Sequence, residues 1–267
     1  MESYKVKGKD LTLTLPNNLK DSSLYLDEPF VLFEISNLIN EEAYADLVQE
    51  MKLKDDYDYE LKGQGGKLRR TIGGHNVDKL TAGTFKSFCL AILSREFYNW
   101  FKKTHLPYFE TKKHQVYVFN TKNIFFRIFR KLCRVLRLPI SFYSSEVEYS
   151  ILNKNSFISP HTDAKTKRLS FVYYLAEEEY CPDIKRNFGT VFHKSRQDKK
   201  PWRRFHGPLL DENEIEDFYT VHEPFYVAEY RPNICACFIK NDVSWHSVSN
   251  IKYDIDRRVI VINVYES

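Results

Sequence analysis

Three side chains in the C-terminal half of the sequence could together hold a metal ion. The segment "SPHTD" places His161 and Asp163 two positions apart, and residues i and i+2 of an extended segment point to the same side. His246, beside Trp245 and shortly before the last apolar run, offers a third ligand. Two histidines and one carboxylate leave coordination positions open, which suits an Fe(II) ion that must also accept a co-substrate and O2. Zinc uses similar ligands, so the ligands alone do not separate the two metals.

A basic residue near the end of the sequence separates them. Arg257 lies eleven residues after His246 and begins the final apolar run. With it, the sequence resembles the 2-oxoglutarate- and Fe(II)-dependent oxygenases, especially the prolyl-4-hydroxylase-like branch. The resemblance extends over about residues 29–266, but it is specific only in short motifs. These are "PHTD" at 160–163, "YYL" at 173–175, "GT" at 189–190, "WHSV" at 245–248 and "RRVIVINV" at 257–264.

The resemblance implies a fold, a cofactor and a reaction. The fold is α+β, with a double-stranded β-helix (jelly roll) core flanked by N-terminal helices. Fe(II) would be held by His161, Asp163 and His246, with 2-oxoglutarate and O2 as co-substrates and no catalytic residue beyond the metal centre. Arg257 would pair with the distal carboxylate of 2-oxoglutarate, for which a planar guanidinium is suited. The reaction would hydroxylate a C–H bond of a prolyl, small-metabolite or carbohydrate substrate and release succinate and CO2.

Two tyrosines are further candidates for binding the co-substrate. Tyr174 matches the strand tyrosine that bonds the distal carboxylate in the resembled branch, although Tyr173 and Tyr174 can equally pack on the two faces of a strand. Tyr149 lies near, but out of register with, a tyrosine at the chelating end of the co-substrate. Relatives often carry a small hydroxyl residue where this sequence has Val259, so the resemblance leaves the distal carboxylate fewer partners.

The N-terminal half is predicted to supply supporting helices. Residues 1–28 are predicted to form an extension or hairpin, and 29–267 a single oxygenase domain with helical support over 83–140. Asn40 is predicted to cap a helix, and 83–103 to form one amphipathic helix. Residues 52–82 contain five glycines and are predicted to be a long loop.

Short apolar runs dominate the sequence from about 145 to 266 and predict the strands of the core. The segment 194–219 is predicted to be a long loop divided by charge. Its basic part holds Lys194, Arg196, Lys199, Lys200, Arg203 and Arg204. These cations could contact an anionic substrate, or they could pair with the acidic run at 211–217.

One segment is strongly basic and amphipathic. Residues 111–145 hold eight Lys or Arg and no acid, and a helix over 123–138 would divide into an apolar half and a basic half. Such a helix could lie on an anionic membrane surface. It could also be a support helix packed across a sheet, which we favour because most such helices face a core. The first interpretation gives an alternative function, a membrane-surface or partner-binding jelly-roll module with a vestigial metal site.

Composition limits the remaining classes of protein. The net charge of +4 is too small to predict a nucleic-acid partner, and the arginine pattern of nucleic-acid demethylases is missing from the last strand. The five cysteines have no framework spacing and are predicted to be free thiols. Without a signal sequence or a long apolar run, the expected location is cytoplasmic. We expect a small-molecule, carbohydrate or peptidyl substrate.

Overall fold

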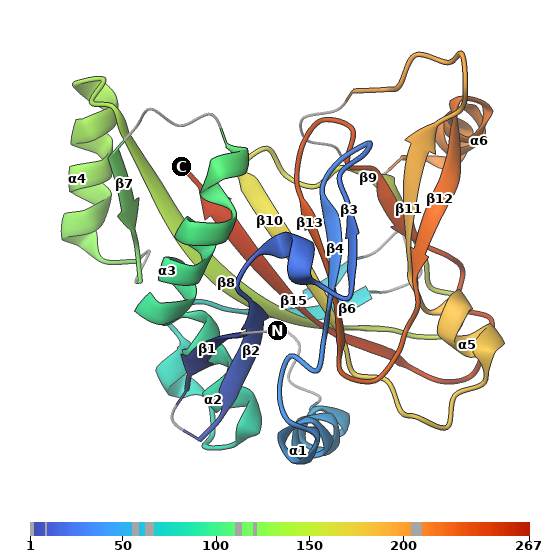
Figure 1. Cartoon of the computed structure of the whole chain (residues 1–267), viewed down its shortest axis with the longest axis horizontal. Coiled ribbons are helices and arrows are strands. Elements are labelled where there is room, and N and C mark those ends of the chain that lie inside the picture. The colour runs from blue at the N-terminus through green and yellow to red at the C-terminus, as the bar shows by residue number, and fades with distance from the viewer. Residues whose placement is uncertain are drawn as a thin grey trace.

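The computed structural model describes residues 3–8, 10–54, 59–61, 67–109, 114–119, 122–203 and 210–267. Most strands in this part of the chain belong to two β-sheets of unequal size, and helices lie around them (Figure 1). The fold is therefore of mixed α and β type, as the sequence predicted.

The larger sheet has nine strands in the described part of the chain. In order across the sheet they are β3 (Leu24–Leu26), β4 (Leu32–Ser36), β13 (Ile234–Ile239), β10 (Lys167–Tyr174), β15 (Arg257–Glu266), β8 (Ile140–Leu152), β6 (Lys67–Ile72) and β5 (Tyr59–Leu61). The ninth strand, β7 (His114–Tyr117), pairs in parallel with β8.

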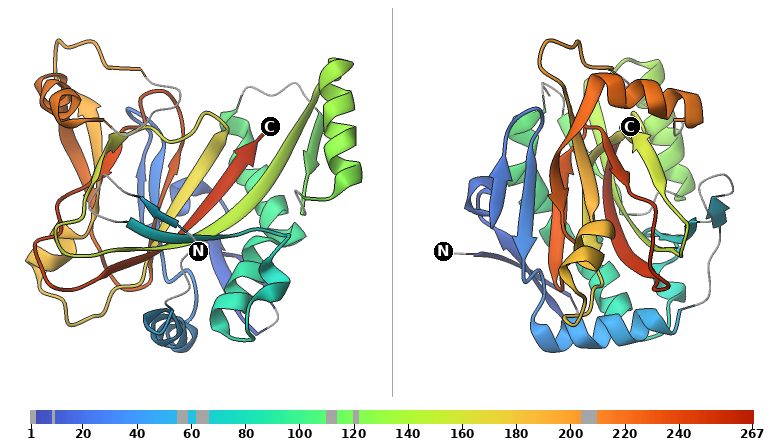
Figure 2. Two further views of the ribbon diagram at one scale, coloured as in Figure 1. Left: turned by 180° about the vertical axis from the view of Figure 1, so that it is seen from behind. Right: turned by 90° about the vertical axis from the view of Figure 1, so that its right-hand side faces the viewer.

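The smaller sheet contains the order β12 (His222–Ala228), β11 (Thr190–Ser195), β14 (His246–Val248) and β9 (Ile158–His161). A separate hairpin is formed by β1 (Ser3–Lys7) and β2 (Thr12–Pro16). From β8 onward the chain passes repeatedly between the two sheets, so that residues far apart in sequence are brought together (Figure 2).

Six α-helices and three short 3-10 helices complete the described part. The α-helices are α1 (Glu41–Lys52), α2 (Thr84–Ile92), α3 (Arg95–Thr104), α4 (Ile124–Val135), α5 (Pro182–Asn187) and α6 (Glu212–Val221). The 3-10 helices are η1 (Leu19–Asp21), η2 (Val77–Lys79) and η3 (Leu106–Tyr108).

The large sheet is buried on both faces, which explains the nearly continuous apolar run of β10. Phe171 and Tyr173 point into a core shared with α1, α2, α3 and the β1–β2 hairpin. Val172 and Tyr174 point into a second core, between the two sheets. Alternate side chains of one strand thus serve opposite faces, and the second core lies directly beside the candidate site.

Three sequence-based assignments require correction and one is confirmed. The predicted helix 83–103 is two helices, because Ser94 accepts a hydrogen bond from the backbone N–H of Phe97 and starts α3 as a new helix. The predicted loop 52–82 contributes β5 and β6 to the large sheet, while Gly63, Gly65 and Gly66 lie outside the described residues. Asn40 caps α1 as predicted, accepting from Ala43 N–H at 2.8 Å.

The third correction concerns the segment 194–219, which is not one loop. It contains the end of β11 and most of α6, which begins at a reciprocal cap between Asp211 and Glu214. Two of its cations bind acids outside α6. Arg196 binds Glu223 at 3.2 Å and Arg203 binds Asp242 at 3.3 Å, while Arg204 lies outside the described residues.

His105 is expected to make folding stability depend on pH. It is fully buried among aromatic rings, including Phe171, and burial lowers its pKa from 6.5 to about 3. The unfolded chain therefore binds a proton that the folded chain excludes, and stability falls as the pH drops from 6.5 toward 3. Between pH 7 and pH 5 this one group costs about 2 kcal/mol of unfolding free energy. Urea unfolding of both proteins at pH 7 and pH 5 should show that the unfolding free energy of His105→Phe falls by about 2 kcal/mol less than that of the wild type. An equal fall in both proteins would contradict the assignment.

Candidate metal centre

The two histidines of the candidate site are cross-strand neighbours. His161 ends β9, and His246 begins β14, which pairs with β9 in the smaller sheet. The register places the two residues opposite each other, and their ring centroids are 4.2 Å apart. Strand pairing therefore brings together two imidazoles that are 85 positions apart in the sequence.

Backbone carbonyls fix the tautomer of both rings. His161 Nδ1 lies 2.9 Å from the carbonyl oxygen of Ser159, and His246 Nδ1 lies 3.1 Å from that of Ser244. Because a carbonyl can only accept, each Nδ1 must carry the proton, which leaves the Nε2 lone pairs available. Burial lowers the pKa of His161, and it lowers that of His246 to about 3. Both rings are thus neutral at pH 7, the form that binds metal.

Asp163 completes the group from just outside the strand. Its Oδ1 lies 4.0 Å from His161 Nε2, and its Oδ2 lies 3.8 Å from His246 Nε2. The expectation that His161 and Asp163 share an extended strand is wrong, because β9 ends at His161 and Asp163 has a φ of 67°. Aspartate tolerates this left-handed conformation better than most residues, and here it turns the carboxylate toward the imidazoles.

Two residues of β10 hold the carboxylate in place. Lys167 Nζ lies 2.6 Å from Asp163 Oδ1, and the Ser170 hydroxyl donates to Oδ2 at 3.0 Å. Burial alone would raise the pKa of Asp163, but the neighbouring Lys167 ammonium and the site histidines hold it well below its usual value. The carboxylate is therefore ionised at neutral pH.

The donor set fits a divalent transition metal. One imidazole nitrogen from each histidine and one carboxylate oxygen lie within 4.8 Å of one another. Within the described residues, this is the one group of His, Cys, Asp and Glu side chains gathered closely enough to hold a metal ion. Two neutral nitrogens and one anionic oxygen, with room for other ligands, match the preferences of Fe(II).

The three side chains line a cavity of about 530 Å³ that also contains Arg257. Arg257 is 2% exposed and starts β15. Its Nε donates to the carbonyl oxygen of Phe188 at 2.5 Å, and its Nη2 donates to the hydroxyl of Thr190 at 3.3 Å. These bonds orient the guanidinium but use only part of its N–H donors, so an anion in the cavity could be bound by the rest.

Thr190 also lines the cavity. It belongs to the "GT" motif at 189–190, but the sequence motif predicted no role for it. Any Cβ at Gly189 would lie 2.6 Å from the carbonyl oxygen of Ala228, so the glycine allows β11 and β12 to approach closely. Thr190 is thereby placed against Arg257 and lines the cavity. It supplies a hydroxyl near the guanidinium that Val259, also in the lining, cannot supply.

The two candidate tyrosines do not line this cavity. Tyr174 lies behind Arg257, whose guanidinium carbon is 5.8 Å from the ring centroid, and its hydroxyl is 2.8 Å from Thr190 Oγ1. Tyr149 points to the opposite face of the large sheet, where it packs edge-on against Phe85. Its neighbours on β8, Glu148 and Ser150, line the cavity, whereas Tyr149 does not.

Lys67 and Arg69 also line the cavity, which the sequence patterns did not predict. Both lie on β6, in the segment 52–82 that the sequence predicts to be a loop. Lys67 and Arg69 bind Glu148 of β8 at 2.7 and 3.2 Å. Burial would raise the pKa of Glu148, but these two cations lower it. With Lys167, they place three cations in the lining against Glu148 and Asp163.

Comparison with known proteins gave structural similarity only. No family model matches the sequence, and no curated protein matches it. Similar solved structures include a prolyl-4-hydroxylase from Pseudomonas putida, with 12% identity, a TM-score of 0.48, and coverage of 92% of this chain and 96% of that one.

Two further similar structures are HygX from Streptomyces hygroscopicus and a prolyl hydroxylase from Trichoplax adhaerens. HygX, with nickel, 2-oxoglutarate and hygromycin B bound, shares 9% identity at a TM-score of 0.46, and the match covers 88% of this chain and 82% of HygX. The Trichoplax enzyme, in complex with a peptide of hypoxia inducible factor, shares 11% identity at a TM-score of 0.44, and the match covers 88% of this chain and 83% of that enzyme.

Proposed function

We propose that the protein is a 2-oxoglutarate- and Fe(II)-dependent oxygenase. Within that class we place it in the prolyl-4-hydroxylase-like branch and propose that it hydroxylates a C–H bond of its substrate. One observation carries the proposal. Two imidazole Nε2 atoms and an ionised carboxylate converge in a cavity that is also lined by a buried arginine, Arg257. The hydrogen bonds that orient Arg257 use only part of its N–H donors.

The jelly-roll core is part of the same proposal and is supported by the order of the strands. From β8 to β15, the chain places β8, β10, β13 and β15 in the larger sheet and β9, β11, β12 and β14 in the smaller one. Both sheets contribute side chains to one core. Such an alternation of antiparallel strands between two packed sheets is the arrangement of a jelly roll.

Each site residue has a distinct role in the proposal. His161, Asp163 and His246 hold the iron, and Lys167 and Ser170 keep the carboxylate oriented. Bound Fe(II), 2-oxoglutarate and O2 supply the oxidising chemistry, which yields succinate, CO2 and the hydroxylated product. Arg257 binds the distal carboxylate of 2-oxoglutarate, and Thr190 offers it a hydroxyl in place of the residue that relatives carry at position 259.

The substrate in this proposal is a peptidyl, carbohydrate or other small molecule with anionic character. Lys67, Arg69 and Lys167 line the cavity, where Glu148 and Asp163 are their counter-charges. Once the carboxylate of Asp163 binds iron, it no longer balances these cations. An acidic group on the substrate would then complete the charge of the cavity.

The test is an anaerobic titration of the metal-free protein with Fe(II) and then with 2-oxoglutarate. We expect a weak visible charge-transfer band that appears only when both are present, and we expect it to be absent in His161→Ala. Zn(II) in place of Fe(II) should give no visible band, because its filled, redox-inert d shell does not give low-energy charge transfer to a ligand. Failure of the wild-type protein to bind either Fe(II) or 2-oxoglutarate would refute the proposed function.

A further inference from the structure

Helix α4 exposes most of its apolar face. Its contact with the rest of the protein centres on Cys133 and Phe126, which pack against Val118 and Phe142. Phe129 also meets the ring of Phe142 edge-on, and Arg130 donates to the Ser267 hydroxyl at 3.2 Å. This contact lies at one boundary between the apolar and basic halves of the helix, so both halves remain open. Phe125 is 80% exposed, Ile128 60% and Val135 70%. The expected support helix with only a basic face in solvent is therefore wrong, since the exposed apolar residues include Ile124, Phe125, Ile128, Phe129, Leu132 and Val135.

The position of α4 makes this face accessible to a large partner. The helix lies at one end of the molecule, away from α6 at the other end (Figures 1 and 2). In the part of the chain that the structure describes, β7, the start of β8 and Ser267 lie against it. Among the described residues, no helix is long and apolar enough to cross a membrane. A face of this kind, on a helix that cannot span a bilayer, suits attachment parallel to a surface.

Charge identifies the partner. Residues 111–145 carry a net charge of +8, so the rest of the chain, with the whole at +4, carries −4. Arg127 and Lys131 are exposed along one border of the apolar face. A second copy of the chain would bring these like charges together, and a nucleic acid would leave the apolar side chains in water. An anionic bilayer accepts both halves of the helix at once.

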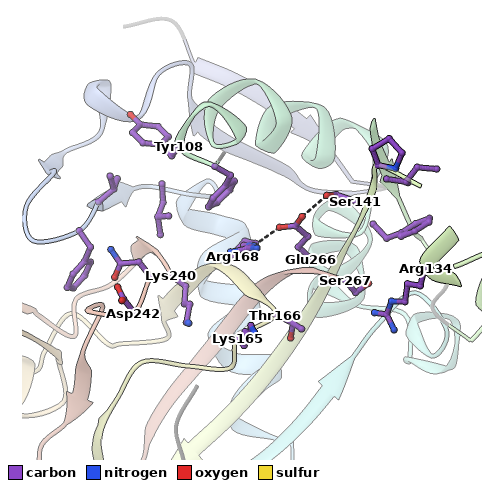
Figure 3. Close-up of a pocket in the computed structure, with 18 of the residues that line it drawn as sticks. Tyr108, Arg134, Ser141, Lys165, Thr166, Arg168, Lys240, Asp242, Glu266 and Ser267 are labelled. Atoms are coloured by element: carbon purple, nitrogen blue, oxygen red, sulfur yellow. Dashed lines mark hydrogen bonds and ion pairs between the residues drawn. The ribbon is translucent and has the colours of Figure 1, made fainter. Parts of the chain in front are cut away.

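A basic cavity of about 1210 Å³ continues this surface beneath the end of α4. Figure 3 shows Arg134, Lys165, Arg168 and Lys240 around it. Two of its three acidic side chains are already engaged, because Glu266 binds Arg168 at 2.6 Å and Asp242 binds Arg203 at 3.3 Å. The third, Asp27, is outnumbered by the other lining cations, which are Arg134, Arg137, Lys165 and Lys240. The remaining positive charge suits the phosphate of a lipid headgroup.

Arg137 strengthens the link between the helix and this cavity. It follows α4 with a φ of 51°, the left-handed conformation in which glycine usually ends a helix. An arginine at such a position is conformationally unfavourable, yet its side chain lines the cavity. We propose that α4 and this basic cavity form a docking surface for a membrane containing anionic phospholipid.

The test is flotation of the full-length protein with vesicles of phosphatidylcholine alone or in equal mixture with phosphatidylglycerol. We expect binding to the mixed vesicles to be at least about tenfold stronger, and to weaken with added salt. The charge reversal Arg127→Glu/Lys131→Glu should weaken it by about tenfold or more. Lys102→Glu/Lys103→Glu, an exposed pair on α3, should leave it unchanged.

Three further variants separate the apolar contact and the cavity cation from folding defects. Phe125→Ser/Ile128→Ser should release the protein from mixed vesicles, whereas Leu53→Ser, at an exposed leucine elsewhere, should not. Arg137→Gly removes a cavity cation while easing the helix end, and should weaken binding by about fivefold without loss of stability. Absence of binding to mixed vesicles would overturn the proposal. So would a dimer in solution that Phe125→Ser/Ile128→Ser converts to a monomer. Neither result depends on Fe(II) or 2-oxoglutarate.

Discussion

Asp163→Ala is expected to abolish Fe(II)-dependent turnover and to weaken Fe(II) binding by more than about 100-fold, since loss of even an outer-sphere partner typically costs 10- to 100-fold. Asp163 is the one anionic member of the metal group. Its removal also leaves the Lys167 ammonium, now 2.6 Å from Oδ1, without that counter-charge and facing the metal position. The variant therefore loses an attractive charge and exposes a repulsive one.

The measurement is anaerobic competition for Fe(II) with a chromophoric chelator, combined with succinate release. Asp256→Ala is the matched control, because Asp256 binds Arg258 at 2.7 Å on a partly exposed edge and does not line the cavity. Asp163→Ala/Lys167→Met should recover part of the Fe(II) affinity if the unpaired ammonium contributes to the loss. Wild-type affinity in Asp163→Ala would show that the metal, if any, binds elsewhere.

The candidate metal group could be predicted from sequence because its residues are close to strand ends. His161 and Asp163 are two positions apart in the sequence, and the apolar runs around His246 identify it as lying beside a strand. Local sequence patterns could not predict how these residues converge. Convergence results from the pairing of β9 with β14 and from the left-handed backbone at Asp163. These depend on tertiary structure.

The residues that were missed or misassigned share a different cause. Lys67 and Arg69 lie on a strand in a polar, glycine-containing segment, where pairing with β8 overrides weak local propensity. Tyr149 was a candidate from its approximate position alone, and position does not fix which face of β8 a side chain occupies, since a shift of one residue reverses the face. For α4, the wheel predicted two halves correctly, but only the packing of Cys133 and Phe126 decides which arc is covered.

Arg257→Met should weaken 2-oxoglutarate binding while leaving Fe(II) binding intact. The guanidinium is buried and oriented by the Phe188 carbonyl, so its contact with a carboxylate would be shielded from water. Breaking a buried ion pair by removing one partner costs about 3–5 kcal/mol, which corresponds to about 10²- to 10⁴-fold in affinity.

Arg258→Met is the control for this last variant, since Arg258 is next in sequence, points to the other face of β15 and binds Asp256. Arg257→Lys should recover only part of the affinity, because an ammonium supplies the charge without the planar fork. The experiment compares the KM for 2-oxoglutarate in succinate release with the Fe(II) affinity from chelator competition. An unchanged KM in Arg257→Met would place the distal carboxylate elsewhere, whereas equal losses of Fe(II) and 2-oxoglutarate binding would mean that Arg257 acts through the fold of the cavity and not through a contact with the co-substrate.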